Sequence, residues 1–381
     1  MPFFVCPRCQ NSNPRFVGYL NDEPYCRRCI SFSGVEAPVI ERKPSPAPIE
    51  LPYKLSDEQR AISNQVRRNY KEGIDTLIYA VCGAGKTELV YGVIADALRK
   101  GEQVGFALPR RDVVIELFYR LKEAFPENKV IAVYGGHNQT LAGDIIVLTT
   151  HQIYRYPNYF DLLVMDEIDA FPFRGNDVLH AFYKHAVRGH VVLMSATPSK
   201  ELLRSFQEKG KDIVELRTRF HKHPIPVPKM CVCPLPVALI RLVFLLRKYK
   251  KAKKPCFVFA PTISKCESLY RVLAPLVANG TFVHSKDKRR SDKIAAFKKG
   301  EYRYLVTTSV LERGITVRDL QVIVFEADEE DIYDSSTLIQ IAGRAGRKYD
   351  APTGEVTFFG NEETRSIARA IKEIEFCNTF L

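Results

Sequence analysis

A glycine-rich stretch at residues 80–87 (AVCGAGKT) constrains the fold of this chain more than any other feature. It lies between the apolar run Leu77–Val81, which indicates a buried strand, and Thr87–Arg99, which has helical periodicity. The stretch matches the phosphate-loop pattern G-x-x-x-x-G-K-[ST], with Ala80 in place of the first glycine. A strand, a tight loop and a helix in this order predict a phosphate-binding turn within an α/β sheet.

The residue types in this loop fit a nucleoside triphosphate and its Mg²⁺ ion. Gly83 and Gly85 let backbone N–H groups of the loop, that of Ala84 included, turn toward phosphates, and the helix that starts near Lys86 points its positive end at them. Lys86 would reach the β- and γ-phosphates, and the Thr87 hydroxyl would ligate Mg²⁺. The loop therefore predicts ATP and Mg²⁺ as cofactors. A turn of the same shape that binds no ligand is the alternative.

A pair of carboxylates follows another strand-like run. Leu162–Met165 leads directly into Asp166, Glu167, Ile and Asp169. Asp166 would hold Mg²⁺, and Glu167 would orient or deprotonate the attacking water. Acidic loops after strands are common, so this motif indicates a Mg²⁺ site only because a phosphate loop precedes it in the same predicted domain. Together the two motifs predict catalytic roles for Lys86, Asp166 and Glu167.

Short apolar runs alternate with helical patterns in two series, which predicts two parallel sheets covered on both faces. A proline-rich stretch precedes each series and indicates a linker. The predicted division is a module at 1–34, a linker at 35–52, a first α/β domain at 53–222, a linker at 223–236 and a second α/β domain at 237–381. The predicted strands are Leu77–Val81, Val104–Leu108, Val130–Tyr134, Ile145–Thr149, Leu162–Met165 and Val191–Met194, then Cys256–Ala260, Thr281–His284, Tyr304–Thr307, Val322–Glu326 and Val356–Phe359.

The second series carries a basic motif at residues 340–347 (QIAGRAGR). Its two arginines, Arg344 and Arg347, are three residues apart and so lie on one side of a helix end or loop. There they could face a γ-phosphate held by the first domain and stabilise the charge of the transition state. Hydrolysis at a site divided in this way would depend on domain closure. Taken singly, the motif could be an ordinary basic loop.

Four of the ten cysteines form two close pairs ahead of the first series. Cys6 and Cys9 are separated from Cys26 and Cys29 by 16 residues, a spacing typical of structural zinc sites. Four thiolates fill a tetrahedron and leave no open position, so the predicted Zn²⁺ is structural rather than catalytic. Disulfides are the alternative, but a cytosolic chain keeps its thiols reduced.

The composition of the 381 residues, with 46% hydrophobic and 26% charged, is that of a globular protein rather than a fibrous or disordered one. There is no apolar run long enough to span a membrane and no secretory signal, which predicts a cytoplasmic protein without a direct membrane span. The net charge is +12, and basic residues cluster at 247–254 and 286–293. Such clusters fit a polyanion such as nucleic acid, although solvated helix faces fit either cluster equally well.

The ordered set of motifs resembles superfamily 2 helicases. The set comprises AxxGAGKT, DEID, the SAT of Ser195–Thr197, the TTSVLERGI segment at 307–315 and QIAGRAGR, and it covers nearly all of Tyr53 to Arg347. The resemblance implies two tandem RecA-like domains with parallel sheets, preceded here by the small four-cysteine module. It also implies a nucleic-acid-stimulated ATPase that acts as a helicase or translocase.

The same resemblance assigns residues that spacing alone does not. Gln59 in LSDEQRAI looks like the adenine-reading glutamine, and Gly314 looks like a residue of the nucleotide site. Arg344 and Arg347 look like the γ-phosphate arginines. The residues that look like contacts to the nucleic-acid backbone are Pro109, Arg110, Arg111, Thr150, His151, Gln152, Thr307 and Thr308.

Two features together resemble the late-competence DNA-uptake helicase family ComFA. The acidic motif continues as DEIDAFPF at 166–173, and a four-cysteine module precedes the motor. This resemblance implies a motor at the cytoplasmic face of the membrane that acts on incoming single-stranded DNA, with other DNA-uptake proteins as partners. Primosomal replication-restart helicases share similar residues, but their zinc cysteines lie within the second motor domain.

Alternative functions stay open at this point. The motor could act on RNA or in replication restart, because such motors grip backbones rather than base edges. The chain could also be an adaptor whose zinc module binds DNA or a partner, with ATP as a switch. Residues 314–340 leave little room for a strand-separating wedge, which favours translocation on single-stranded DNA over duplex unwinding. Polarity, oligomeric state and the partner of the module are not predicted.

Overall fold

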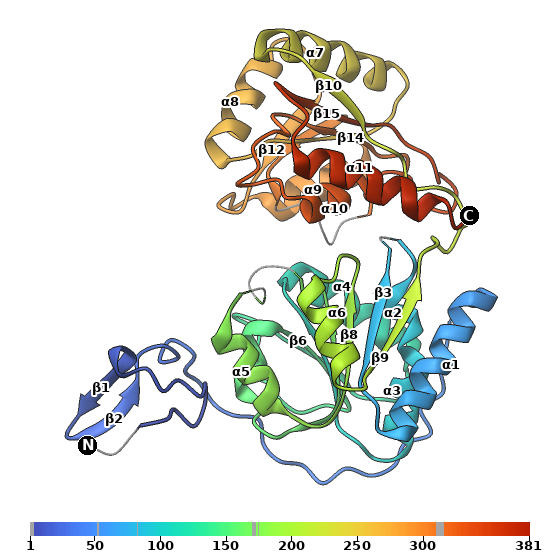
Figure 1. Cartoon of the computed structure of the whole chain (residues 1–381). Helices are drawn as coiled ribbons and strands as arrows, with labels where there is room; N and C mark the ends of the chain where they lie inside the picture. Colours follow the sequence, from blue (N-terminus) through green and yellow to red (C-terminus); the bar gives the residue numbers. More distant parts are fainter. Residues whose placement is uncertain (1–3, 52, 82, 170–172, 174, 310–315) are drawn as a thin grey trace. The chain divides into compact units, whose positions relative to one another are not determined.

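The computed structural model describes residues 4–51, 53–81, 83–169, 173, 175–309 and 316–381. By its internal contacts the chain divides into two units (Figure 1). The first unit comprises Met1–Ala80 with Gly85–Leu216, and the second comprises Val81–Ala84 with Arg217–Leu381. Each unit is built on its own parallel sheet, so the prediction of two successive parallel α/β domains is confirmed.

The described part of the first unit holds a seven-stranded sheet in the order β5-β6-β4-β7-β8-β3-β9. Every neighbouring pair of strands is parallel. The central strands are buried along nearly their whole length, as expected for a sheet covered on both faces. The strands are β3 (Thr76–Ala80), β4 (Val104–Leu108), β5 (Val130–Val133), β6 (Ile145–Thr149), β7 (Phe160–Asp166), β8 (Val187–Ser195) and β9 (Asp212–Leu216).

The helices of the first unit have recognisable ends. Ser56 and Gln59 form a capping box at the start of α1, and Gly73 ends that helix in the left-handed region with φ 78°. The prediction of one continuous helix over Thr87–Arg99 is wrong in one respect, because Val90 separates this stretch into two helices, α2 and α3. The helices are α1 (Asp57–Glu72), α2 (Lys86–Leu89), α3 (Tyr91–Arg99), α4 (Arg111–Ala124), the 3₁₀ helix η2 (Thr150–Arg155), α5 (Asp177–Ala186) and α6 (Lys200–Glu208).

The second unit holds a six-stranded parallel sheet among its described residues, in the order β10-β15-β14-β11-β13-β12. Its core is formed by β11, β13 and β14, which are buried along their whole length. The elements are β10 (Lys229–Val232), α7 (Leu235–Lys251), β11 (Cys256–Phe259), α8 (Ile263–Leu273), β12 (Gly280–Val283), α9 (Arg290–Lys299), β13 (Tyr304–Thr307), β14 (Gln321–Val324), α10 (Ser335–Ala342), β15 (Val356–Gly360) and α11 (Arg365–Asn378).

The N-terminal module contains a short antiparallel hairpin that belongs to the first unit. After the 3₁₀ turn η1 (Pro14–Phe16), the strands β1 (Val17–Leu20) and β2 (Glu23–Cys26) are joined by Asn21 and Asp22. These two residues adopt φ of 51° and 63°, the left-handed conformation that a two-residue hairpin turn requires.

The proline-rich segment after the module has no helix or strand among its described residues, yet it packs against the first unit. The side chain of Ala47 is fully buried. The Ser45 amide donates to the Leu98 carbonyl at 3.0 Å, and the Glu50 amide donates to the Ala124 carbonyl at 2.9 Å. The segment is therefore extended, as predicted, but it lies on the surface of the first unit as an ordered strap. Within the described ranges, no helix is long and apolar enough to cross a membrane.

Candidate ATPase site and N-terminal metal site

The motifs predicted to act on ATP lie at one edge of the first sheet. The phosphate loop follows β3, the acidic motif begins at the end of β7, and Ser195 ends β8. Strand β8 lies between β3 and β7 and pairs with both. Because all three strands are parallel, their carboxyl ends share one edge, which is where α/β sheets bind ligands. The sheet order thus brings together three motifs that are far apart in the sequence.

The phosphate loop adopts the backbone that its glycines allow. Gly83 and Gly85 have φ of 84° and 77°, and Gly85 caps the N-terminus of α2, which begins at Lys86. A Cβ atom at Gly85 would lie 2.6 Å from Nε2 of Gln59, so a side chain at this position would collide with Gln59. Gln59 is 5% exposed and packs against the loop, while its Oε1 accepts from the Ser56 amide at 3.0 Å. The glutamine assigned by resemblance is thus beside the phosphate loop.

Lys86 and the acidic motif face each other in the first unit. The Lys86 Nζ lies 3.7 Å from Oδ1 of Asp166, which also accepts from the Glu167 amide at 2.8 Å. Burial raises the pKa of Asp166, and the neighbouring carboxylates of Glu167 and Asp169 add to this shift, whereas Lys86 opposes it. Glu167 has φ 56°, an uncommon conformation for a side-chain-bearing residue. A cation at this position would relieve the repulsion among the three carboxylates, so the donor set fits Mg²⁺.

The last carboxylate of the acidic motif connects it to β8. Asp169 accepts from the Ser195 hydroxyl at 2.7 Å through Oδ1 and from the Thr197 hydroxyl at 2.7 Å through Oδ2. The Thr197 amide in turn donates to Ser195 Oγ at 3.0 Å. Charge-assisted hydrogen bonds of this kind are strong, so they tie the position of the acidic motif to the end of β8.

A cluster behind the phosphate loop was not predicted from the sequence. Glu88, in the first turn after the loop, is 5% exposed and accepts from the Tyr53 hydroxyl at 2.6 Å. It also forms an ion pair with Arg120 of α4. Burial and the Glu88 carboxylate raise the pKa of Tyr53 to about 12, so this phenol stays protonated and keeps donating. These contacts hold α2 against α4. They could not be predicted from a local sequence pattern, because the three residues lie in separate parts of the sequence.

The residues assigned to nucleic-acid contacts in the first unit follow β4 and β6, at the same edge of the sheet. They differ in exposure. Pro109 and Thr150 are buried, Arg110 and Gln152 are half-buried, and Arg111 and His151 are exposed. Arg111 lies over the ring of Tyr134 at 4.8 Å, and Gln152 Oε1 accepts from Arg155 Nε at 2.6 Å. Their role in binding a backbone stays a prediction.

The assigned residues of the second unit are mostly buried. Thr307 and Thr308 are 0% and 8% exposed, and the Thr307 hydroxyl donates to the Thr308 carbonyl at 3.1 Å. Arg344 is 4% exposed and Arg347 is half-buried, both in the loop that follows α10. Gly314 lies outside the described residues. The roles assigned to these five residues stay predictions.

The four cysteines of the module form a closed cluster. Their sulfur atoms all lie within 4.8 Å of one another, and all four side chains are buried. The distances are 3.6 Å between Cys6 and Cys29 and 3.5 Å between Cys9 and Cys26. Bonds of about 2.3 Å to a tetrahedral zinc ion place sulfur atoms about 3.8 Å apart, whereas a disulfide requires about 2.05 Å. The donor set therefore fits a zinc ion and not two disulfides.

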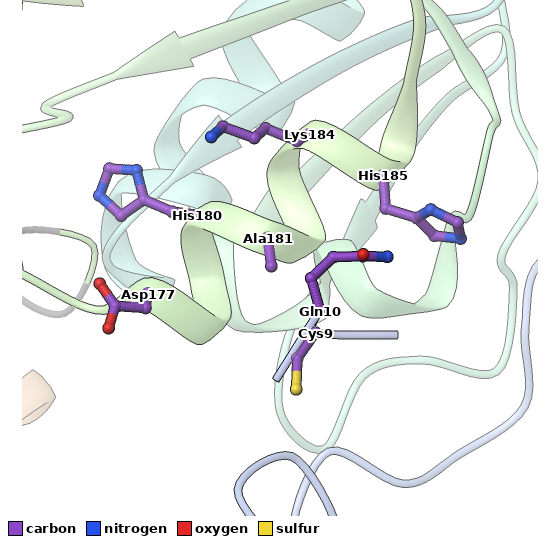
Figure 2. Close-up of a pocket in the computed structure, with 7 residues that line it drawn as sticks. All are labelled: Cys9, Gln10, Asp177, His180, Ala181, Lys184 and His185. Atoms are coloured by element: carbon purple, nitrogen blue, oxygen red, sulfur yellow. The ribbon is translucent and has the colours of Figure 1, made fainter. Parts of the chain in front are cut away.

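The module docks on α5 and η2 through Phe32. Its ring packs edge-on against Phe182 at 5.1 Å and Tyr154 at 5.9 Å, measured between ring centroids. Arg28 adds an ion pair with Asp177 at 2.7 Å. A cavity of about 450 Å³ remains between the module and α5. Figure 2 shows the side chains that line this cavity, namely Cys9, Gln10, Asp177, His180, Ala181, Lys184 and His185.

Comparisons with known proteins agree with this architecture. Residues 57–205 match the DEAD/DEAH box helicase family, and residues 237–349 match the helicase conserved C-terminal domain. The competence protein ComFA of Bacillus subtilis is 33% identical over 98% of this chain and 86% of its own length. ComFA of Streptococcus pneumoniae is 33% identical over 98% of this chain and 90% of its own length. The chain belongs to the ComFA family.

Solved structures similar to this ComFA family member show the same fold at low sequence identity. Yeast Dbp5 bound to RNA and ADP BeF3 has a TM-score of 0.65 at 17% identity and covers 84% of this chain and 91% of its own. RecG bound to a three-way DNA junction has a TM-score of 0.59 at 19% identity and covers 87% of this chain and 47% of its own. The predicted pair of RecA-like domains is thereby confirmed.

The predicted enzyme class is also confirmed. The two helicase domains together identify this ComFA family member as an ATPase of helicase superfamily 2, which uses ATP and Mg²⁺. The resemblance inferred from the ordered motifs, from the phosphate loop to QIAGRAGR, named the correct family.

Proposed function

We propose that this chain is an ATP-driven motor that moves along single-stranded DNA during DNA uptake in natural competence. The observation that carries the proposal is the assembly of the phosphate loop, the acidic motif and the end of β8 at one edge of the first sheet. Two curated relatives that the chain matches over 98% of its length are named as competence proteins.

Residues of the phosphate loop and of the acidic motif have proposed parts in hydrolysis. Backbone amides around Gly83, Ala84 and Gly85 and the Lys86 ammonium bind the phosphates, and Gln59 contacts the base. Thr87 and Asp166 hold Mg²⁺, which when bound neutralises charge on the phosphate oxygens. Glu167 orients the attacking water and accepts its proton.

The second unit contributes the arginines. We assign charge stabilisation in the transition state to Arg344 and Arg347, which follow α10 in one short loop. We also propose that Gly314 contributes to the nucleotide site. Single-stranded DNA would be held by the loops after β4, β6 and β13, that is by residues 109–111, 150–152 and 307–308. Domains at 53–222 and 237–381, with linkers at 35–52 and 223–236, are part of the proposal, although residues 217–222 group by their internal contacts with the second unit.

The N-terminal module at 1–34 is proposed to hold a structural Zn²⁺ through Cys6, Cys9, Cys26 and Cys29. The support is the buried four-sulfur cluster, whose spacing fits a tetrahedron. The motor is proposed to work at the cytoplasmic face of the membrane through other DNA-uptake proteins.

The test is steady-state ATP hydrolysis with and without single-stranded DNA, compared with RNA of equal length. We expect strong stimulation by DNA in the wild type and none in Glu167→Gln, which should still bind ATP. Glu363→Gln, a matched change of an exposed glutamate, serves as the control. If RNA stimulates hydrolysis more strongly than DNA of equal length, the substrate is RNA rather than DNA. ATP binding without stimulation by either would favour the adaptor function, with ATP as a switch.

A further inference from the structure

A buried arginine supports the loop that carries the two proposed γ-phosphate arginines. Arg219 lies in the segment of sequence that connects β9 to β10, and it is 2% exposed. Its Nη1 donates to the carbonyls of Ala345 at 3.0 Å and Gly346 at 2.7 Å, and its Nη2 donates to the carbonyl of Gly343 at 3.1 Å. All of these residues belong to the second unit.

The chemistry of these carbonyls explains why an arginine stands here. Gly343 is the C-cap of α10, so the loop begins where a helix leaves carbonyl oxygens unpaired and where its dipole is negative. A guanidinium offers five N–H donors in a rigid plane and no acceptor, and it can therefore bond several carbonyls at once. A lysine would supply the charge without the fixed fork of donors.

A histidine from the same segment reinforces this contact. The Nε2 of His221 lies 3.1 Å from the Gly346 carbonyl, and its Nδ1 accepts from the His223 amide at 3.1 Å. Because Nδ1 accepts, the proton is on Nε2, which donates to Gly346. Burial and the Arg219 cation lower the pKa of His221, which keeps the ring neutral in this tautomer.

The loop is also confined on its other side. Gly346 has φ 61°, and a Cβ atom there would lie 2.2 Å from the carbonyl oxygen of Pro352. The backbone of Gly346 is therefore held between Arg219 and Pro352, directly before Arg347. No other residue type would fit at this position without moving the loop.

We propose that Arg219 is a positioning residue for ATP hydrolysis, which acts by fixing the backbone from which Arg344 and Arg347 project. This inference rests on the proposed function, in which those two arginines stabilise the transition state. Such stabilisation depends on donors that are held in place before the reaction, so a small displacement reduces turnover. Arg219 also lies beside Gly83 of the phosphate loop, where a Cβ atom would be 3.6 Å from the Arg219 Nε. A lysine keeps the positive charge and adds no bulk there, so nucleotide binding through Lys86 and Thr87 should be affected much less.

The first experiment separates turnover from binding. In Arg219→Lys, we expect DNA-stimulated kcat to fall by about tenfold to a hundredfold, while the KM for ATP and the Kd for a non-hydrolysable ATP analogue change by less than about twofold. Arg217→Lys is the matched control, since Arg217 lies two residues away and packs over the rings of Phe376 and Phe380. The thermal unfolding midpoint of each variant shows whether the fold is intact.

A double-mutant cycle then distinguishes positioning from general stability. If Arg219 acts through Arg347, adding Arg219→Lys to Arg347→Lys should lower kcat little further than Arg347→Lys alone. The proposal would be overturned if the fold-losses in kcat of the two single variants multiply in the double variant. It would also be overturned if Arg219→Lys has the kcat of the wild type. Normal turnover in both Arg344→Ala and Arg347→Ala would instead refute the proposed role of the arginine pair itself, and this inference with it.

Discussion

Replacing Phe32 by alanine should loosen the contact of the N-terminal module with α5 and η2 without releasing the proposed zinc ion. Phe32 connects the module to α5 and η2 through its edge-on contacts with Phe182 and Tyr154. Aromatic pairs of this kind contribute about 0.5–1.5 kcal/mol each beyond the area they bury. Loss of both should therefore cost about 2 kcal/mol, which corresponds to an increase of about 30-fold in the equilibrium constant for opening.

Hydrogen exchange of the segment behind Phe32 measures this opening. The Ala37 amide donates to the Arg155 carbonyl at 2.8 Å, so its exchange with solvent requires the segment to detach from η2. We expect this amide to exchange about 30-fold faster in Phe32→Ala than in the wild type. Phe32→Ala keeps all four cysteines and the backbone amide of residue 32, which donates to the Cys29 carbonyl at 3.0 Å, so zinc content should not change.

Ile30→Ala provides the matched control for this measurement. Ile30 lies two residues from Phe32 and is 56% exposed, so its truncation should leave the Ala37 amide protected. Equal exchange rates in Phe32→Ala and Ile30→Ala would show that the aromatic contacts do not hold the module, and would refute the reasoning. Loss of zinc in Phe32→Ala would also contradict it.

The remaining predictions concern the phosphate loop, one ion pair and the metal site. Lys86→Ala should abolish ATP hydrolysis, because the Lys86 ammonium is the group assigned to the phosphates; measurable turnover in a steady-state assay would remove that role. Asp96→Asn should destabilise the fold by about 1–2 kcal/mol at pH 7, because it weakens bonds of 2.7 and 2.9 Å from the partly exposed Arg67. Burial opposes ionisation of Asp96, but Arg67 outweighs it and lowers the pKa. This contribution is therefore present above about pH 4 and is lost as the pH falls through the lowered pKa, so thermal unfolding midpoints of the two proteins should converge in acid. Cys6→Ser should release zinc, measured by elemental analysis, and make residues 1–34 sensitive to protease; retained zinc would argue against the four-cysteine site.

The sequence predicted the buried strands accurately, but it missed two of the four strands that lie at the edges of the two parallel sheets in the described residues. The bounds of β4, β6 and β13 agree with the predicted runs to the residue, because strands buried on both faces are continuously apolar. Strands β9 and β10 were missed. They lie at the edges of their sheets and are only partly buried, so polar residues such as Glu215 interrupt the apolar pattern.

The candidate site divides in the same way. The phosphate loop and the acidic motif were predictable because their chemistry is carried by contiguous residues. Arg219 was not, since its partner Gly343 is 124 residues away and only the fold brings them together. The contact of Glu88 with Tyr53 and Arg120 was missed for the same reason, since these residues are 35 and 32 positions apart in sequence.

The strap that joins the module to the motor has a consequence for how this chain can vary in length. Between residues 33 and 50 the backbone bonds the first unit at separate points, which include Ala37, Ser45 and Glu50. Some side chains between these points, such as Val39 at 88% exposure, face solvent and are free to change, whereas Ala47 is buried and Arg42 pairs with Asp144. An insertion or deletion between them would shift every later anchor out of register. Natural and engineered variants should therefore accept many substitutions in this segment but few changes in its number of residues.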